Sequence, residues 1–202
     1  MLVLATANRG KVREMAEVLA DLPLRIVPLS EFPGVALPPE GATSYADNAL
    51  AKAHAAAEAT RAWALGDDSG LEVDALGGGP AVLSARFGGA GLDDAGRCRA
   101  LLAAIADVPP ARRTARFRSV IAICQPGGRQ ALVDGMVEGV LLDAPRGRGG
   151  FGYDPLMYYP ALEATFAELP PEVKNTVSHR GVALLRARAV LRSWLATAGP
   201  AS

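Results

Sequence analysis

The chain has 202 residues and carries 21 basic and 21 acidic side chains, so its formal net charge at pH 7 is zero. This balance leaves no overall field to attract nucleic acid or an anionic membrane, and neither is expected as a partner. No segment has the apolar length of a membrane span, the start has no recognisable secretory signal, and the two cysteines lack a paired spacing. We therefore expect a cytoplasmic protein with a single domain over residues 1–202.

Strand-like and helix-like patterns alternate in the first third of the chain. An apolar run at 2–5 is typical of a buried strand, and apolar residues at helical spacing follow over 12–19. Prolines and glycines mark 32–41 as a loop. Ser44, with an acidic residue three positions later, predicts the start of an alanine-rich helix that continues to about Arg61.

The same alternation continues through the rest of the chain. Residues 63–66 form a candidate strand that leads directly into acidic residues, and 93–106 read as a helix. Two long strands, 117–124 and 130–142, are joined by a Pro-Gly-Gly turn, which predicts a hairpin and therefore a mixed sheet. A final apolar helix is expected over about 178–196. Because no repeat or low-complexity linker interrupts this order, we predict one α/β unit.

The lysines of this chain are placed unevenly. Eighteen arginines carry most of the positive charge, yet Lys11, Lys52 and Lys174 each lie within four residues of one of the three asparagines. A lysine ammonium is a compact point charge on a flexible stem, and phosphate is a frequent partner for it. The alternative is that a biased composition left these residues together by chance.

The segment TANRGK, from Thr6 to Lys11, lies at the predicted strand-to-helix turn. Backbone N–H groups and the positive end of the helix dipole favour an anion there, and Thr6, Asn8 and Lys11 add donors. A Walker-type phosphate loop is excluded, because that motif needs Gly and Ser or Thr where this chain has Ala5 and Val12. An ordinary capped turn with a solvated Lys11 is the alternative to phosphate binding.

Two adjacent carboxylates, Asp67 and Asp68, follow the predicted strand in GDDSGLEVDAL. Buried carboxylates need a cation, and with histidine scarce and thiolates distant, Mg²⁺ is favoured over Zn²⁺. Glu40 and Glu72 are further candidate ligands. Because successive strand residues point to opposite sides, only one Asp is expected to face a given point. A turn with exposed carboxylates is the alternative.

Two later segments combine glycine, aromatic and basic residues: GGFGYDP at 149–155 and KNTVSHRG at 174–181. The glycines allow a ligand to approach the backbone closely, and Phe151 and Tyr153 could stack on a planar base. The second segment places basic residues at the start of the final helix, which favours an anion. Taken singly, His179 and the two rings are more often parts of ordinary packing.

Together these segments closely resemble the inosine triphosphate pyrophosphatase family, whose members hydrolyse deaminated purine nucleoside triphosphates such as ITP, dITP and XTP to the monophosphate and pyrophosphate. The resemblance spans nearly the whole chain in order, through TANRGK, SYADNALAKA, DDSGLEVDALGGGPAVLSARFGG, FGYDP and TFAELPPEVKNTVSHRG. The chain departs from the family pattern at Ala7, Ala81 and Leu83. These departures bear on the loops rather than on the reaction.

The resemblance implies a role for each matching residue. Asp68 is expected to act as the general base, and Glu40 and Asp68 to hold Mg²⁺. The other residues expected to bind the nucleoside triphosphate are Thr6, Ala7, Asn8, Arg9, Gly10, Lys11, Lys52, Ser69, Phe151, Gly152, Tyr153, Asp154, Lys174, His179 and Arg180. The family also implies a homodimer and a long mixed β-sheet flanked by helices in two lobes, with the active site in the cleft between them.

Two other functions are compatible with parts of the sequence. A Maf-type pyrophosphatase acting on pyrimidine nucleoside triphosphates shares the expected architecture, but its usual Ser-Pro-Arg-Arg-like opening loop is absent here. A non-catalytic nucleotide-binding module would keep the phosphate-binding lysines but would have no use for a buried pair of carboxylates. Mg²⁺-dependent turnover and a panel of purine and pyrimidine nucleotides distinguish the three.

Overall fold

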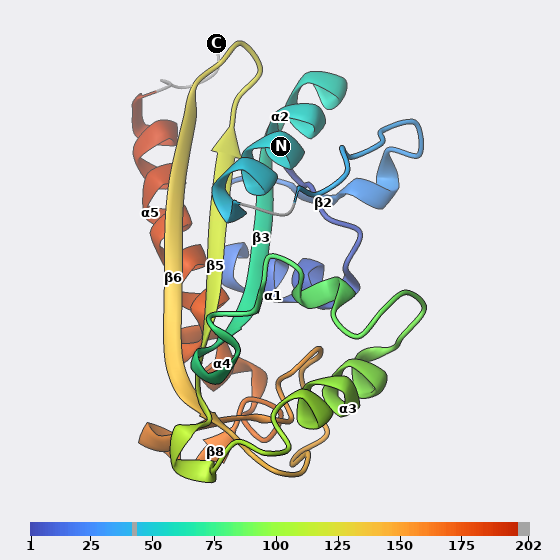
Figure 1. The fold of residues 1–202 in the computed structure, drawn as a ribbon. Helices are drawn as coiled ribbons and strands as arrows, with labels where there is room; N and C mark the ends of the chain where they lie inside the picture. The colour runs from blue at the N-terminus through green and yellow to red at the C-terminus, as the bar shows by residue number, and fades with distance from the viewer. Residues whose placement is uncertain (42–43, 198–202) are drawn as a thin grey trace. The chain divides into compact units, whose positions relative to one another are not determined.

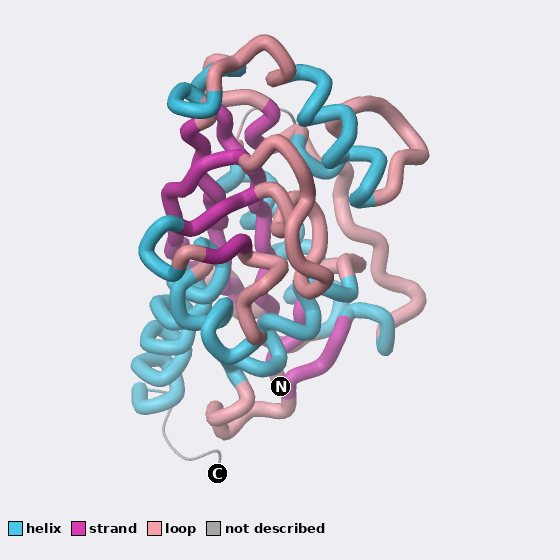
Figure 2. The backbone as a smooth tube through the Cα atoms, turned by 90° about the horizontal axis from the view of Figure 1, so that it is seen from below, coloured by secondary structure: helices cyan, strands magenta, loops and turns pink. Residues whose placement is uncertain are grey.

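The structure of the protein is a computed structural model, which describes residues 1–41 and 44–197 (Figures 1 and 2). Its strands are β1 (Leu2–Leu4), β2 (Ile26–Pro28), β3 (Trp63–Val73), β4 (Pro80–Ala81), β5 (Thr114–Cys124), β6 (Gln130–Leu141), β7 (Met157–Tyr159) and β8 (Ala164–Thr165). Its α-helices are α1 (Arg9–Leu19), α2 (Tyr45–Thr60), α3 (Asp94–Ala104), α4 (Pro171–Val177) and α5 (His179–Thr197). Short 3-10 turns are η1 (Leu29–Glu31), η2 (Asp74–Leu76), η3 (Ser84–Arg86), η4 (Pro110–Arg112) and η5 (Pro160–Leu162).

The described strands form one eight-stranded mixed sheet. Its order is β2-β1-β3-β5-β6-β7-β8, with β4 beside β3. β1 pairs in parallel with β2 and β3, whereas β7 pairs antiparallel with β6 and β8. The predicted α/β class and mixed sheet are therefore confirmed.

Local signals located the long elements, with errors at the end of β3 and at the start of β5, which begins at Thr114 rather than at 117. The Ser44 hydroxyl accepts a hydrogen bond from the backbone N–H of Asp47 at 3.1 Å, so the predicted helix cap is present. The strand expected at 63–66 instead continues to Val73 as β3, so Asp67 and Asp68 lie within a strand rather than after it. Aspartate and glycine disfavour strands locally, and long-range contacts override that preference here.

The described chain groups into two compact units, each considered by itself below. The first comprises 1–68, 119–135 and the chain from 180 onward, and the second comprises 69–118 and 136–179. The chain passes from one unit to the other within β3, β5 and β6, and between His179 and Arg180 at the start of α5. The expected single domain, and the cleft between two lobes, stay predictions.

The core of the first unit lies between the strands and two helices, α1 and α5. Strand residues that share one face pack against apolar residues of these helices. This cluster contains Leu2, Leu4, Met15, Leu19, Leu22, Leu65, Ile121, Ile123, Ala183, Leu184, Ala187, Leu191 and Trp194. Leu65 therefore marks the face of β3 that points toward α1 and α5.

Gly66 lets α2 approach the opposite face of β3. A Cβ atom built on Gly66 would lie 2.3 Å from the carbonyl oxygen of Ala49 and 2.9 Å from the backbone nitrogen of Ala53. Both alanines are fully buried, and both belong to α2. Glycine is therefore needed at this position because any side chain would meet the backbone of the helix.

We expect Gly66→Ala to lower the free energy of unfolding by about 1–3 kcal/mol or more, because the added methyl forces α2 away from β3. Urea denaturation of the purified variant measures this change. Gly34→Ala is the control, since nothing lies within 4 Å of a Cβ atom at that position. Equal stability of the two variants would contradict the close approach of α2.

The second unit has a separate core. Residues of β3, α3, β5, β6 and the segment 153–166 pack together there, including Leu71, Leu101, Phe117 and Phe166. Phe117 and Phe166 meet edge to face with ring centroids 5.8 Å apart. Among the helices that the structure describes, none has the length and apolar character needed to cross a membrane.

Candidate active site

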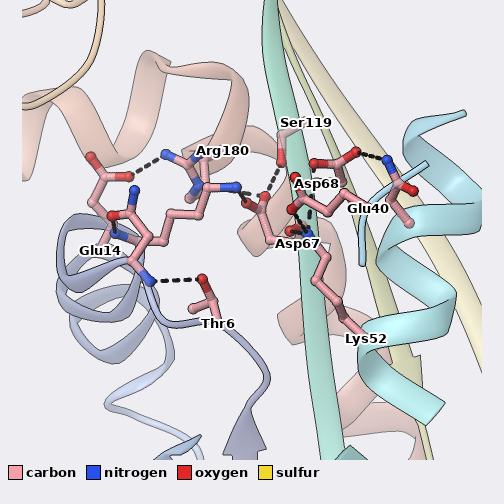
Figure 3. Close-up of polar contacts among 11 residues, drawn as sticks. Thr6, Glu14, Glu40, Lys52, Asp67, Asp68, Ser119 and Arg180 are labelled. Carbon is pink, nitrogen blue, oxygen red and sulfur yellow. Dashed lines mark hydrogen bonds and ion pairs between the residues drawn. The ribbon is translucent and has the colours of Figure 1, made fainter. Parts of the chain in front are cut away.

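Strand β3 sends its two adjacent carboxylates to opposite faces. Side chains alternate along a strand, so Asp67 shares the face of Leu65 and Asp68 shares the face of Gly66. Asp67 therefore points toward α1 and α5, and Asp68 points toward α2. Both carboxylates are buried, with 0% and 3% of their surfaces exposed. The expectation that only one of the two carboxylates faces a given point agrees with their separate sets of partners, which Figure 3 shows.

Asp67 is enclosed by positive charge. Its carboxylate lies 2.6 Å from the Lys11 ammonium and 3.5 Å from Nε of Arg180, and it accepts a 2.6 Å hydrogen bond from the Ser119 hydroxyl. In Figure 3 the Arg180 guanidinium lies between Asp67 and Glu14, whose carboxylate is 2.7 Å from Arg180. Burial alone would raise the pKa of Asp67, but Arg180, Lys11 and the two hydrogen bonds lower it well below its usual range. Asp67 is thus a fixed anion and is unsuited to accept a proton.

Asp68 has the opposite character. Burial raises the pKa of Asp68 above its usual value, against the Lys52 charge and a hydrogen bond from Asn48. The Lys52 ammonium lies 3.6 Å from the Asp68 carboxylate and 2.7 Å from that of Glu40. It also donates to the backbone carbonyl of Asp67 at 2.7 Å. Asp68 is therefore the carboxylate better suited to accept a proton.

The carboxylates of Glu40 and Asp68 lie near each other, beside the Lys52 ammonium. Both lie within 3.6 Å of the same Lys52 nitrogen, and both supply the oxygen donors that Mg²⁺ prefers. Among the described residues, no group of three or more His, Cys, Asp or Glu side chains has a metal-binding arrangement. An ion held by this pair would need further oxygen ligands, which phosphate and water commonly supply. Glu72, the other candidate ligand, instead lies 3.7 Å from Arg116 and 4.0 Å from Arg118.

The segment Thr6 to Lys11 forms a capped turn between β1 and α1. Asn8 is the N-cap, and its side-chain oxygen accepts from the backbone N–H of Lys11 at 3.1 Å. The Thr6 hydroxyl accepts from the backbone N–H of Asn8 at 3.2 Å. Ala7, Asn8 and Arg9 are exposed. The Lys11 side chain is paired with Asp67 rather than solvated, which excludes one part of the ordinary-turn alternative.

A pocket of about 630 Å³ lies beside this turn within the first unit. Its lining includes Thr6, Ala7, Arg9 and Arg13 together with apolar residues of α1 and of 28–35. Among the described residues, the lining contains none of the carboxylates discussed above. The pocket is therefore distinct from the region around Glu40 and Asp68.

The segment 150–154 of the second unit is organised by Asp154. One of its carboxylate oxygens accepts from the backbone N–H of Phe151 at 2.8 Å and lies 2.5 Å from the Lys174 ammonium. That ammonium is also 4.9 Å from the centroid of the Phe151 ring. A Cβ atom on Gly150 would lie 2.1 Å from the same carboxylate oxygen, so glycine is required there. The loop thus brings Phe151, Asp154 and Lys174 together.

The same loop is anchored to α3 and η3. The Tyr153 hydroxyl donates to the carbonyl oxygen of Ser84 at 2.8 Å, and burial raises the pKa of Tyr153 to about 12, which keeps the phenol protonated. The backbone N–H of Gly152 donates to the Asp94 carboxylate at 2.7 Å. Since Tyr153 is only 5% exposed, Phe151 is the ring better placed to stack on a ligand.

The adjacent basic residues His179 and Arg180 have different surroundings. His179 begins α5 and stacks on Phe117, with ring centroids 4.7 Å apart. Arg180 belongs to the Asp67 and Glu14 cluster described above. Ser69 follows Asp68 in β3 and is half-buried. The role expected for each of these residues in substrate binding stays a prediction.

A protein-family model described as the Ham1 family matches residues 2–190. The chain belongs to the Ham1 family. This membership confirms the resemblance inferred from the ordered motifs. Two similar relatives are a protein of Desulforamulus reducens, 53% identical over 94% of each chain, and one of Geobacter sulfurreducens, 48% identical over 98% of each chain. Both relatives are named dITP/XTP pyrophosphatase.

Solved Ham1 structures have the same fold as this chain. A HAM1 protein from Coxiella burnetii superposes with a TM-score of 0.82 at 39% identity, covering 95% of this chain and 98% of the other. A nucleoside-triphosphatase / dITP/XTP pyrophosphatase from Mycobacterium abscessus has a structure that superposes with a TM-score of 0.73 at 40% identity. It covers 92% of this chain and 97% of the other.

Three residues of this Ham1 chain contact Asp67, Asp68 or their partner Arg180 but were given no role in the site from the sequence. They are Glu14, Asn48 and Ser119. The position of Glu14 three residues after Lys11, on the same helical face, was an available signal. Asn48 lies four residues before Lys52, which also places both on one face of α2. Ser119 lies within the apolar strand β5. A role for its hydroxyl becomes apparent only when β5 lies beside β3, where the hydroxyl donates to Asp67.

Proposed function

We propose that this protein hydrolyses deaminated purine nucleoside triphosphates, ITP, dITP and XTP, to the nucleoside monophosphate and pyrophosphate, and so removes them from the nucleotide pool. The observation that carries the proposal is a buried carboxylate of raised pKa, Asp68, beside Lys52 and Glu40. This carboxylate occurs in a chain of the Ham1 family. The chain matches two relatives over nearly their full length, and both are named dITP/XTP pyrophosphatase.

Asp68 is proposed as the general base. It would take the proton of a water molecule as that water attacks the α-phosphorus, and such a positioned base contributes about 10²- to 10⁴-fold to the rate. The bond from the α-phosphorus to the bridging oxygen breaks, and pyrophosphate leaves with its electron pair. Asp67 is unsuited to this purpose because its lowered pKa, set by Arg180, Lys11 and Ser119, gives it little affinity for a proton.

Positive charge is needed to bind the triphosphate and to stabilise the leaving pyrophosphate. One opposing charge about 4 Å away contributes at most about 4 kcal/mol at an effective dielectric near 20, so several must act together. Lys11 and Lys52 would supply two charges, and the exposed N–H groups at the start of α1 would supply dipoles. Glu40 and Asp68 would hold Mg²⁺, which when bound supplies a further positive charge to the phosphate oxygens.

Recognition of the base is assigned to the loop 151–154 with Lys174 and His179. Hypoxanthine and xanthine carry a keto oxygen at C6, which needs a donor, whereas adenine carries an amino group there. Lys174 is a donor whose ammonium pairs with Asp154 and lies over the Phe151 ring. The backbone N–H groups of Phe151 and Gly152 are already hydrogen-bonded to carboxylates within the loop.

The preferred substrates test the proposal. We expect ITP, dITP and XTP to be hydrolysed with a kcat/KM at least about 10²-fold above that for ATP, because a site built to donate to a keto oxygen leaves its donors unpaired opposite an amino group. The assay separates the products of each nucleotide by chromatography in the presence of Mg²⁺. Pyrimidine triphosphates in the same panel test the Maf-type alternative.

Comparable rates for ATP and ITP would overturn the substrate assignment. Release of orthophosphate and a diphosphate would overturn the reaction. Binding without turnover would leave a nucleotide-binding module, although such a module gives no reason for a buried Asp68 of raised pKa. The cytoplasmic location and the homodimer implied by the family resemblance stay predictions.

A further inference from the structure

We propose that Asn48 is a positioning residue that holds Asp68 and the segment carrying Glu40 in one arrangement. The effect on catalysis rests on the proposed function. The contacts of Asn48 are observed in the structure and do not depend on that function. Asn48 lies in the first turn of α2 and is 6% exposed. A buried amide needs partners for its polar atoms, and those partners reveal what it fixes.

The side-chain amide of Asn48 uses both of its ends. Its oxygen accepts from the backbone N–H of Gly41 at 2.8 Å. Its nitrogen donates to the carbonyl oxygen of Gly41 at 3.3 Å and to the Asp68 carboxylate at 2.8 Å. Gly41 directly follows Glu40 in the chain. One side chain thus joins the backbone next to Glu40 to the carboxylate of Asp68.

These partners fix the orientation of the amide. An ionised carboxylate and a carbonyl group only accept hydrogen bonds, so the nitrogen of Asn48 must face Asp68 and the Gly41 oxygen. Turning the amide over would set its oxygen against both acceptors and leave the Gly41 N–H facing a donor. An aspartate at position 48 would likewise place a second carboxylate beside Asp68.

The short reach of Asn48 depends on close packing of α2 on β3. Gly66, two residues before Asp68, allows the backbone of α2 to approach the strand where any side chain would collide. One carboxylate oxygen of Asp68 is then tied to Asn48, and the other lies 3.6 Å from Lys52. Asn48 and Lys52 together fix the rotation of the Asp68 carboxylate. A general base needs such a fixed orientation, because one of its oxygen lone pairs must point at the proton that it accepts.

Two substitutions test this role, Asn48→Ala and Asn48→Asp. Each is expected to lower kcat for dITP by about 10- to 100-fold, the usual loss when a hydrogen-bond partner of a ligating carboxylate is removed. KM is expected to change much less, because the residues of 6–11 are untouched. Asn48→Ala is also expected to speed amide hydrogen exchange at Gly41 and to weaken Mn²⁺ binding measured by calorimetry without nucleotide.

Thr165→Ala provides a matched control for a general loss of stability. Thr165 is fully buried, and its hydroxyl donates to the carbonyl oxygen of Arg146 at 2.8 Å within the second unit. This variant should lower the thermal midpoint while keeping the parent's kcat. The inference is overturned if Asn48→Ala keeps the parent's kcat, or if its loss of kcat is no larger than that of Thr165→Ala at a similar midpoint.

The exchange and Mn²⁺ measurements separate this inference from the proposed function. If the parent protein hydrolyses none of the nucleotides, the proposed function fails, and faster exchange at Gly41 with weaker Mn²⁺ binding in Asn48→Ala still supports the role of Asn48. Unchanged exchange and unchanged Mn²⁺ binding overturn that role whatever the activity of the parent.

Discussion

Asp68→Asn is expected to lower kcat for dITP by about 10²- to 10⁴-fold, because it removes the proposed base at nearly constant side-chain volume. The amide cannot accept a proton from water at neutral pH, and it also removes one negative charge from the proposed metal-binding pair. Steady-state kinetics at saturating Mg²⁺ and dITP measure this loss. The thermal midpoint should not fall, because burial raises the pKa of Asp68 and its ionised form therefore opposes folding at neutral pH.

Asp74→Asn is a suitable control for the loss of a carboxylate from the same region of the sequence. Asp74 accepts from the Thr114 hydroxyl and pairs with Arg116 at 2.7 Å. The Asp74→Asn variant should retain the parent's kcat. An Asp68→Asn variant that remains as active as this control would remove Asp68 from the role of base.

Asp67→Asn is expected to act mainly on stability, lowering the free energy of unfolding by about 3–5 kcal/mol. The substitution leaves Lys11 and Arg180 buried, and Glu14 then remains as the nearby anion, 2.7 Å from Arg180. A buried charge that loses its partner keeps its desolvation penalty without the compensating attraction. Urea denaturation at pH 7 measures the difference between the parent and the variant.

The effect of Asp67→Asn should depend on pH in a defined direction. The pKa of Asp67 is lower in the folded protein than its ordinary value of 3.8, so in acid the unfolded chain binds more protons than the folded one. The contribution of Asp67 to stability is therefore complete well above pH 3.8 and is lost as the pH falls below it. The stability difference between parent and variant should shrink in that acidic range, and a constant difference would contradict the ion pairs of Asp67.

Several elements of the fold follow from interactions between near neighbours. The Ser44 cap of α2 and the turn between β5 and β6 involve residues a few positions apart, so local propensity predicts them. The capped turn from Thr6 to Lys11, between β1 and α1, also follows from its local pattern. The short strands β7 and β8 and the helix α4 were not predicted, because two or three residues give no clear period and the helix spans only Pro171–Val177.

The sequence by itself determined which residues carry charge, and it gave the expectation that Asp67 and Asp68 face opposite sides if the strand geometry extends to them. The tertiary structure placed both residues within β3. Only the tertiary structure decided that the two have opposite pKa shifts. Asp67 meets Lys11 from α1 and Arg180 from α5, and Asp68 meets Asn48 and Lys52 from α2. Arg180 and Glu14 are 166 positions apart in the chain. Charge and burial at such separations depend on packing, so adjacent residues of identical chemistry acquire different protonation behaviour only when the chain folds.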